Sequence, residues 1–192
     1  MGQGLLMKKL LLNFQDKKEL VSIRRDGIDE NRIQGFVLSF SDELVLLQYV
    51  YDFNLDGLMV LRLSDITKIE SDKTDVFQTQ ILKDEGLYSQ IDFEKKYDVN
   101  NWHTVFSSIG SKPGLVIVEN ETQSDSSDET FILGKIDKID QDSVSILGFS
   151  GAANWYEESS KMRYKDISSA QVNNKYMNMY QRYFDKNSSD TL

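Results

Sequence analysis

The side chains that most often carry catalysis are scarce in this chain of 192 residues, which has one histidine, His103, and no cysteine. A Ser-His arrangement or a zinc site needs several convergent partners, so His103 is predicted to be a partly exposed structural residue. The lack of cysteine excludes disulfides, thiolate ligands and cysteine nucleophiles. Glycine-rich phosphate loops, nucleophile elbows and metal motifs are also missing from the sequence. We therefore expect no catalytic residues, no metal site and no cofactor, and a protein that is not an enzyme.

Carboxylates gather in two short clusters, one in each half of the chain. The clusters are Asp26, Asp29 and Glu30, and Asp125, Asp128 and Glu129. Their spacing lacks the glycine-pinned order of a calcium-binding loop, which places ligands at alternate positions around a sharp turn. A solvated acidic surface is the simpler interpretation of both clusters.

Basic residues concentrate at one place, near the start of the chain. The residues are Lys17, Lys18, Arg24, Arg25 and Arg32. They are either solvated strand ends balanced by the neighbouring acidic residues, or a patch that contacts RNA phosphates. The sequence leaves both interpretations open.

Aromatic residues mark two further segments in the second half. Trp155 and Tyr156 follow Gly151 and form either a hairpin tip packed on its neighbour or an exposed anchor for a protein partner, a role that aromatic residues favour. A stripe with helical spacing runs from Tyr176 to Phe184. We expect this stripe to be core or packing between the two halves, and otherwise a dimer seam.

Composition indicates a folded protein with an acidic balance. Hydrophobic residues make up 40% of the chain and aromatic residues 11%, and the formal net charge is -9. This charge disfavours a general electrostatic interaction with nucleic acid or anionic lipid, although local basic patches remain compatible with it. The sequence has no apolar run near the roughly 18–20 residues that span a bilayer. We expect a cytoplasmic protein that does not bind membranes.

The chain repeats a set of landmarks in the same order, at an offset that drifts from roughly 95 to roughly 101 residues. The matching segments are Lys18–Ile23 with Pro113–Val118, Ile33–Val37 with Ile132–Ile136, Asp42–Leu47 with Asp142–Leu147, and Arg62–Thr67 with Arg163–Ser168. An ordered repeat of this kind predicts an internal duplication, and loop insertions account for the drift.

Each copy of the repeat reads as a helix, five short strands and a second helix. We expect a mainly β fold with flanking helices, in which each set of strands closes into a small barrel. The predicted domains are residues 1–86 and 98–192. Residues 87–97 form the linker, with a weak alternation that allows an extra strand, and Asp98 is the expected cap of the helix that follows.

Two motifs resemble the signatures of the Sm (LSm/Hfq-type) family, in which a glycine opens a strongly bent strand. The first signature is matched by Gly35, Val37, Phe40, Leu44 and Leu46, and the second by Arg62, Asp65 and Ile66. The second half repeats both more loosely, at Gly134–Ile136 and Arg163–Ile167. The resemblance implies a tandem pair of Sm-like barrels, and another SH3-like barrel is the alternative.

The residues with which Sm proteins bind uridine-rich RNA are largely replaced in this chain. Ser41 and Val45 stand at the positions of the family's Asp and Asn, and Leu63 at that of its glycine. An apolar Val45 cannot hydrogen-bond a base edge, and an unpaired base edge in a dry pocket costs a few kcal/mol. In the second half Asp140 keeps the Asp position, whereas Tyr164 fills the glycine position.

Together these features predict a non-catalytic interaction module that binds a protein partner or self-associates through strand edges and helices. Sm-like barrels characteristically join edge to edge, since their open strands can pair with a neighbour. The alternative is RNA binding through the basic residues between Lys17 and Arg32.

Overall fold

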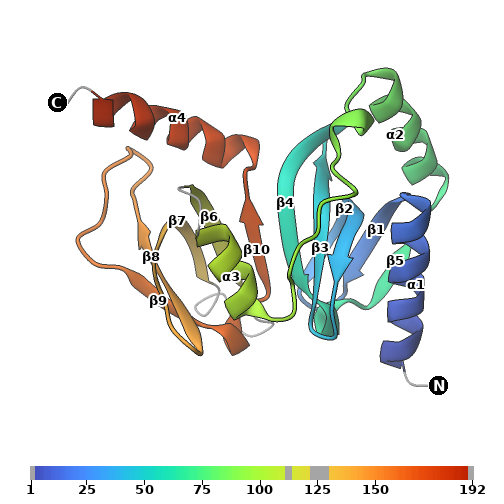
Figure 1. Cartoon of the computed structure of the whole chain (residues 1–192), viewed down its shortest axis with the longest axis horizontal. Coiled ribbons are helices and arrows are strands. Elements are labelled where there is room, and N and C mark those ends of the chain that lie inside the picture. The colour runs from blue at the N-terminus through green and yellow to red at the C-terminus, as the bar shows by residue number, and fades with distance from the viewer. Residues whose placement is uncertain (1–2, 111–113, 122–129, 190–192) are drawn as a thin grey trace. The chain divides into compact units, whose positions relative to one another are not determined.

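The chain divides into two compact units, residues 1–100 (unit 1) and 101–192 (unit 2), in a computed structural model that describes residues 3–110, 114–121 and 130–189. Each unit holds five antiparallel strands with a helix before them and a helix after them (Figure 1). The expectation of a mainly β fold with flanking helices is confirmed. The acidic cluster at Asp125, Asp128 and Glu129 lies outside the described residues.

Unit 1 begins with a helix that leads directly into the first strand. Its elements are α1 (Gln3–Lys17), β1 (Leu20–Arg25), β2 (Asp29–Phe40), β3 (Leu44–Tyr51), β4 (Asn54–Arg62), the 3₁₀ turn η1 (Leu63–Asp65), β5 (Lys68–Glu70), α2 (Lys73–Asp84) and the 3₁₀ turn η2 (Tyr88–Gln90).

Unit 2 repeats this order. Its elements are α3 (Trp102–Gly110), β6 (Leu115–Asn120), β7 (Thr130–Ile139), β8 (Ser143–Gly148), β9 (Ser160–Arg163), the 3₁₀ turn η3 (Tyr164–Asp166), β10 (Ser169–Val172) and α4 (Lys175–Ser189). The start of α3 lies later than predicted. Asn101, whose side chain accepts a hydrogen bond from the Thr104 amide (2.9 Å), precedes the helix, and the Asp98 carboxylate accepts instead from Asn100.

The expected closed barrels are not formed within either unit. Pairing in unit 1 runs β5-β1-β2-β3-β4, and in unit 2 it runs β10-β6-β7-β8-β9. Among the described residues no pairing joins β4 to β5, or β9 to β10. The terminal strand of each order is too short to close a cylinder, because β5 has 3 residues and pairs with β1, while β9 has 4 and pairs with β8. Each set of strands is therefore an open sheet.

The second strand of each unit bends at the same place, and a glycine allows it. The register shifts between Val37 and Ser39 in β2, and between Ile136 and Lys138 in β7. Just before each shift, a Cβ on Gly35 would lie 2.8 Å from the Gln48 carbonyl oxygen. A Cβ on Gly134 would lie only 2.1 Å from the Leu147 carbonyl oxygen. Both positions need glycine because the neighbouring backbone passes too close for a side chain.

The 3₁₀ turns before the last strands also recur with matching hydrogen bonds. The amide of Leu63, which opens η1, donates to the Glu43 carbonyl over 2.7 Å. In unit 2 the amide of Tyr164 donates to the Asp142 carbonyl over 2.9 Å. The two units therefore have the same backbone plan, because the order of elements, the bend of the second strand and the 3₁₀ turn before the last strand recur in both.

The sheet of unit 1 is covered on both faces. The helix α1 packs Met7, Leu11 and Phe14 on a core that the strands supply. On the other face Phe36 meets Tyr88 and Phe93 at ring distances of 5.5 and 5.8 Å. Residues 87–97, all described by the structure, contain η2 and no strand, so the extra strand allowed there is not formed. Aromatic packing by this segment, rather than strand pairing, covers Phe36 on the second face.

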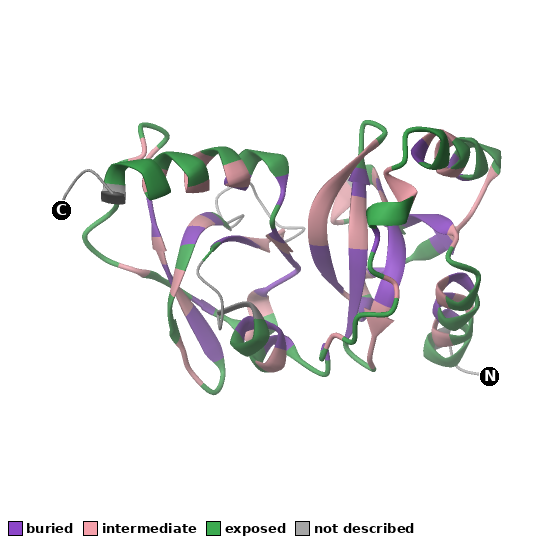
Figure 2. Ribbon diagram, turned by 45° about the horizontal axis from the view of Figure 1, so that its top comes forward, coloured by how far each residue is buried: buried purple, intermediate pink, exposed green. Residues whose placement is uncertain are grey.

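Unit 2 is covered by its two helices. On α3, Trp102, Val105 and Phe106 are buried, and the Phe106 ring stacks on Tyr164 at 6.1 Å. On α4 only part of the surface is buried, and exposed residues dominate its ribbon in Figure 2. Among the described residues, no helix combines the length and apolar character needed to cross a membrane.

Candidate interaction surface

The most prominent surface feature lies on unit 2, where α4 meets the loop that follows β8. Phe149, which is buried, forms the centre of an aromatic cluster. Its ring lies 5.3 Å from Trp155, 4.8 Å from Tyr180 and 5.0 Å from Phe184. Trp155 and Phe184 are themselves 4.5 Å apart. Aromatic pairs at these distances add stability beyond the area that they bury, so the cluster fixes the loop against the helix.

Local hydrogen bonds give the loop at residues 149–156 a defined shape. The amides of Ser150 and Ala153 donate to the carbonyls of Asn154 and Ser150, both over 2.8 Å, and the Tyr156 amide donates to the Gly148 carbonyl over 2.9 Å. Ala153 has a φ of 60°, the left-handed region. Gly148 faces the Tyr156 ring, which a Cβ on the glycine would approach to 3.1 Å. The tight turn brings Trp155 back beside Phe149.

The helix α4 is positioned by its first turn. Asn174 precedes the helix, and its side-chain oxygen accepts a hydrogen bond from the Met177 amide over 2.8 Å, as a capping residue does. Met177 is buried with Leu115, Ile117 and Phe149. The buried side of the helix continues through Tyr180 and Phe184, which lie at helical spacing from Met177.

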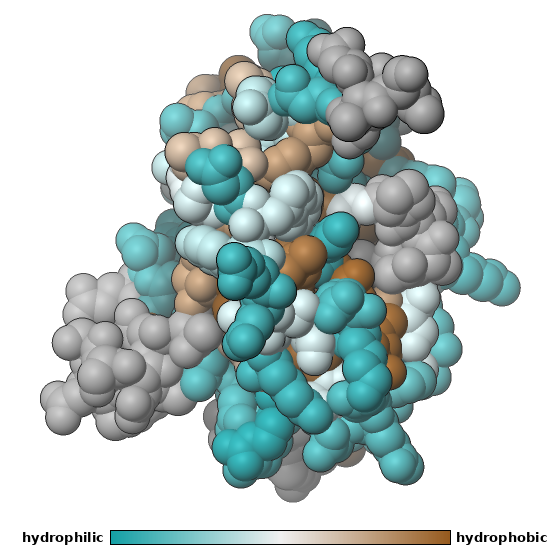
Figure 3. All heavy atoms as spheres, turned by 90° about the vertical axis from the view of Figure 1, so that its left-hand side faces the viewer, coloured by the Kyte–Doolittle hydropathy of each residue, from teal (hydrophilic) through white to brown (hydrophobic). Residues whose placement is uncertain are grey.

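The rest of the aromatic stripe on α4 faces outward. Tyr176 is 55% exposed, Met179 62% and Tyr183 53%. Of the alternatives for the stripe from Tyr176 to Phe184, packing in the core of unit 2 is wrong for these three residues, because the helix buries only the row through Met177. Packing between the halves and a dimer seam stay predictions. Figure 3 shows this side of the protein, where hydrophobic residues reach the surface in several places between hydrophilic ones.

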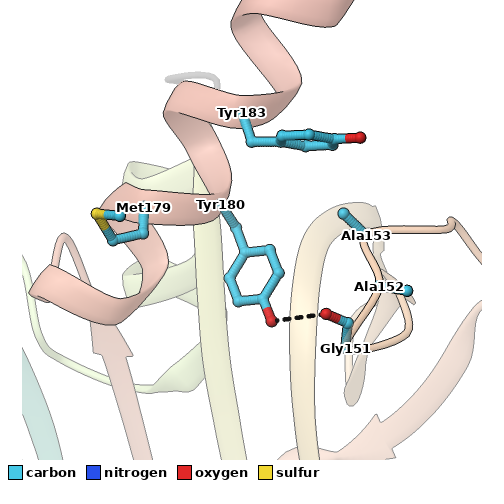
Figure 4. A pocket seen from close by; sticks show the side chains of 6 residues that line it. All are labelled: Gly151, Ala152, Ala153, Met179, Tyr180 and Tyr183. Atoms are coloured by element: carbon cyan, nitrogen blue, oxygen red, sulfur yellow. Dashed lines mark hydrogen bonds between the residues drawn. The ribbon is translucent and has the colours of Figure 1, made fainter.

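A groove of about 320 Å³ separates the outer side of α4 from the loop. Met179, Tyr180 and Tyr183 line one wall, and the small residues Gly151–Ala153 line the other (Figure 4). The Tyr180 hydroxyl donates a hydrogen bond to the Gly151 carbonyl over 3.1 Å and so joins the two walls. Small residues on one wall leave room, and aromatic residues on the other supply contact area.

Tyr176 lies beside Tyr180 in the first turns of α4. A hydrogen bond with Tyr180 is the main cause that raises the pKa of Tyr176, with a smaller contribution from burial. The two rings lie 5.3 Å apart. Neutral hydroxyls can both donate and accept hydrogen bonds, so this wall offers polar contacts as well as apolar area.

The predicted anchors Trp155 and Tyr156 lie at the edge of this surface. Trp155 packs on Phe149 and Phe184 and keeps 37% of its surface exposed, with the Lys135 ammonium 4.9 Å from its ring centre. Tyr156 is 55% exposed. Sequence reasoning included the groove residues Met179 and Tyr183 only within the stripe for which a dimer seam was the last alternative. The sequence does contain a signal for these residues, because the apolar stripe on this helix is wider than the single row of side chains that a helix can bury against one sheet.

The basic residues of unit 1 do not form one exposed patch. Lys17, Lys18 and Arg24 are exposed, whereas Arg25 and Arg32 are not. Lys18 pairs with Glu94 at 2.9 Å, and Arg25 is buried and lies 3.8 Å from Asp29. Arg32 pairs with two carboxylates, those of Asp72 (3.1 Å) and Asp75 (3.4 Å).

Arg32 belongs to a buried polar network beneath α2. Asp75, fully buried, accepts hydrogen bonds from Ser22 (2.7 Å) and Gln34 (2.8 Å). Its carboxylate also accepts from the Asp72 amide over 2.9 Å, while Asp72 caps the helix. The hydrogen bond from the Asp75 amide, together with those from Thr74 and Arg32, lowers the pKa of Asp72 against a smaller opposing effect of desolvation. These interactions fix α2 on β1 and account for the burial of a charge.

The remaining candidates stand apart from one another. His103 is exposed, with its ring 6.4 Å from Tyr164. Asp26 bonds to Thr67, and Asp29 accepts from Asn31. Within the described part of the chain, acidic residues and histidine form no group of three or more that could hold a metal ion.

Comparison of the chain with protein-family models, curated proteins and solved structures finds no match.

Proposed function

We propose that the chain is a non-catalytic interaction module that binds a protein partner or a second copy of itself through the groove surface of unit 2. The groove surface is defined by Met179, Tyr180 and Tyr183 on α4 and by Gly151–Ala153. The observation that carries the proposal is the exposure of Tyr176, Met179 and Tyr183 side by side on a helix whose opposite side is well packed.

Aromatic residues and methionine are enriched at protein interfaces, where their large side chains supply contact area. In the groove these side chains stand on a helix fixed by the Phe149 cluster, which supports a surface ordered before binding. The scarcity of histidine and cysteine in the sequence supports a role without catalysis.

We further propose that each unit is an Sm-like fold and that the two arose by duplication. Support comes from the leading helix, the five strands and the glycine at the bend of the second strand, all of which recur in both units. The proposal concerns descent and architecture. Ser41, Val45 and Leu63 still replace the residues with which Sm proteins bind RNA.

RNA binding through the basic residues of unit 1 is the weaker proposal. Arg25 is buried and Arg32 is partly buried between two carboxylates, so only Lys17, Lys18 and Arg24 of the five expected cations are exposed, and Lys18 is paired with Glu94. RNA binding through phosphates requires cationic side chains that can replace the counterions of the nucleic acid.

Paired substitutions test the proposed function. Met179→Ser with Tyr183→Ser should abolish capture of the partners that the full-length chain retains from an extract, and should dissociate any oligomer seen by light scattering. The control is Phe77→Ser, since Phe77 is a helical aromatic of unit 1 that is 58% exposed. Retention of every partner and of the oligomer by the groove variant would contradict the proposal.

A further inference from the structure

The outer side of α4 carries a basic stripe beside the groove. Lys175, Met179, Arg182 and Lys186 follow one another at spacings of three and four residues, which places them in one row on the helix. All four are exposed, and the Arg182 guanidinium donates to the Met179 sulfur. The basic stripe is thus continuous with the apolar wall of the groove.

The sign of this stripe is opposite to that of the chain as a whole. Between Lys175 and Ser189 there are three cations and one carboxylate, Asp185, whereas the whole chain has a net charge of -9. A local cationic surface on an acidic protein favours an anionic ligand, and it disfavours other proteins that share the basic character.

We propose that the groove surface binds an acidic linear peptide through an apolar anchor. This inference rests on the proposed function and specifies its partner. The anchor, a large apolar side chain, enters the groove between Tyr183 and Ala153, and the acidic residues that flank it lie along Lys175, Arg182 and Lys186. A groove of about 320 Å³ has room for one or two side chains, which suits a short segment better than a folded surface.

Charge also sets the side on which the peptide's acidic residues lie. Along the chain, the loop wall is followed by two exposed carboxylates, Glu157 and Glu158, and the loop also holds Trp155 against the Lys135 ammonium. The loop side therefore carries charges of both signs, whereas the cations of α4 attract carboxylates of the ligand to the helix side. The peptide therefore lies with its acidic residues over α4 and its uncharged side toward the loop.

Two other occupants fit less well. A second copy related by a twofold axis would bring the same basic stripe of each chain together, which is unfavourable in a symmetric interface. Single-stranded RNA would satisfy the cations, but it stacks its bases on flat aromatic platforms, and one wall of this groove is made of glycine and alanine.

Three pools of bead-bound peptides test the inference with the full-length chain. Each pool has a central Trp or Leu, with flanks randomised among acidic, basic or uncharged polar residues. We expect retention on the acidic pool to exceed that on the uncharged pool by about fivefold or more, since exposed charge pairs contribute a few tenths to one kcal/mol each. Retention on the acidic pool should fall as salt rises, because the pairs are exposed.

Variants assign the effect to the stripe and the groove. Arg182→Glu with Lys186→Glu should remove the preference for acidic flanks, and Met179→Ser with Tyr183→Ser should remove binding to all pools. Lys73→Glu with Lys96→Glu, two exposed lysines of unit 1, serves as the charge-matched control and should leave retention on every pool unchanged.

The outcomes separate the inference from the proposed function. Equal retention on all three pools that still depends on Met179 and Tyr183 would overturn the acidic partner and leave the interaction surface standing. Retention on no pool would overturn the proposal that the ligand is a linear peptide. Unchanged capture of cellular partners by the groove variant would also overturn the proposal that the groove surface is the interaction site. Stronger binding of an oligouridine probe than of the acidic pool, lost in the Arg182 and Lys186 variant, would assign the surface to RNA instead.

Discussion

The helix that follows the five strands is docked by opposite chemistry in the two units. In unit 1 the third residue of α2 is Asp75, which is buried among Ser22, Gln34 and Arg32. In unit 2 the third residue of α4 is Met177, which is buried in an apolar cluster. The positions correspond one to one. The pairs are Ser22 with Ile117, Arg32 with Phe131, Gln34 with Leu133, and Asp75 with Met177.

The strand register supports this correspondence. Ser22 pairs with Gln34 across β1 and β2, and Ile117 pairs with Leu133 across β6 and β7. The polar set and the apolar set therefore occupy the same places on one backbone plan. A buried polar network fixes a helix only if all of its partners are present, whereas an apolar cluster is satisfied by contact alone. A variant that replaces the polar set of unit 1 with the apolar set of unit 2 must therefore change all four residues together.

The polar docking of α2 and the apolar docking of α4 also leave different side chains exposed in the first turns of the two helices. The N-terminal turn of α2 directs its polar groups inward to Asp75 and Arg32. The first turns of α4 bury Met177 and leave Tyr176 and Met179 exposed. Among the described residues, unit 2 combines the apolar docking of its last helix with an exposed row of Tyr176, Met179 and Tyr183, and for that reason we propose the interaction site there.

Breaking the polar network should give one of the two largest effects on stability. Asp75→Met alone leaves Ser22, Gln34 and the Arg32 guanidinium without their buried acceptor, and we expect a loss of about 3 kcal/mol in the free energy of unfolding. Urea unfolding followed by circular dichroism measures it.

The matched variant carries the whole apolar set, Ser22→Ile, Arg32→Phe, Gln34→Leu and Asp75→Met. It should regain most of the lost stability, since apolar replacement of a complete buried polar set is often neutral. A full set that is less stable than Asp75→Met alone would contradict the correspondence between the units.

The two bend glycines should differ in their sensitivity. Gly134→Ala is expected to cost about 3 kcal/mol and Gly35→Ala about 1–2 kcal/mol, because a side chain in a filled space forces the backbone to move. The added Cβ would lie 2.1 Å from a carbonyl oxygen at position 134 and 2.8 Å from one at position 35, so the substitution at Gly134 should be the more costly. Thermal unfolding of the two variants compares them, and a larger loss for Gly35→Ala would show that the bend of unit 2 is the more adaptable.

Trp155 and Tyr156 should separate structural from binding roles. Trp155→Ala removes the contacts with Phe149 and Phe184 and should destabilise the protein by about 2 kcal/mol, below the value for a fully buried tryptophan. Tyr156→Ala should cost less than about 1 kcal/mol, because Tyr156 is mostly exposed. Chemical unfolding measures both. A small loss for Trp155→Ala would indicate that this residue is an anchor for a partner and not part of the loop's core.

The smallest effects concern the hairpin tips. Phe53 in unit 1 and Ala153 in unit 2 both have a φ of 60°, which side chains other than glycine adopt at a cost. Phe53→Gly should stabilise the protein by about 1 kcal/mol and Ala153→Gly by about 0.5 kcal/mol, as relief of strain exceeds the added freedom of the unfolded chain. Differential scanning calorimetry detects the shifts. Destabilisation by Phe53→Gly would mean that its ring makes contacts that outweigh the strain.

Sequence reasoning predicted the element order and the repeat because both depend on local patterns, such as the glycine before each bend and the apolar periodicity. It failed where long-range geometry decides. The row of α4 that is buried depends on how Asn174 sets the start of the helix, and a shift of one residue moves Tyr176 from core to surface. The pairing of Arg32 with Asp75 joins residues far apart in the chain, and no local pattern in either segment marks it.

Site-specific photo-cross-linking tests most directly whether unit 2 carries the interaction surface. A benzophenone side chain is placed at Tyr183 in one protein and at Phe77 in another, both at exposed aromatic positions on helices. After irradiation in cells, discrete adducts that mass spectrometry resolves should form from position 183 and not from position 77. Adducts from position 77 alone, or the same adducts from both positions, would contradict the assignment of the interaction surface to unit 2.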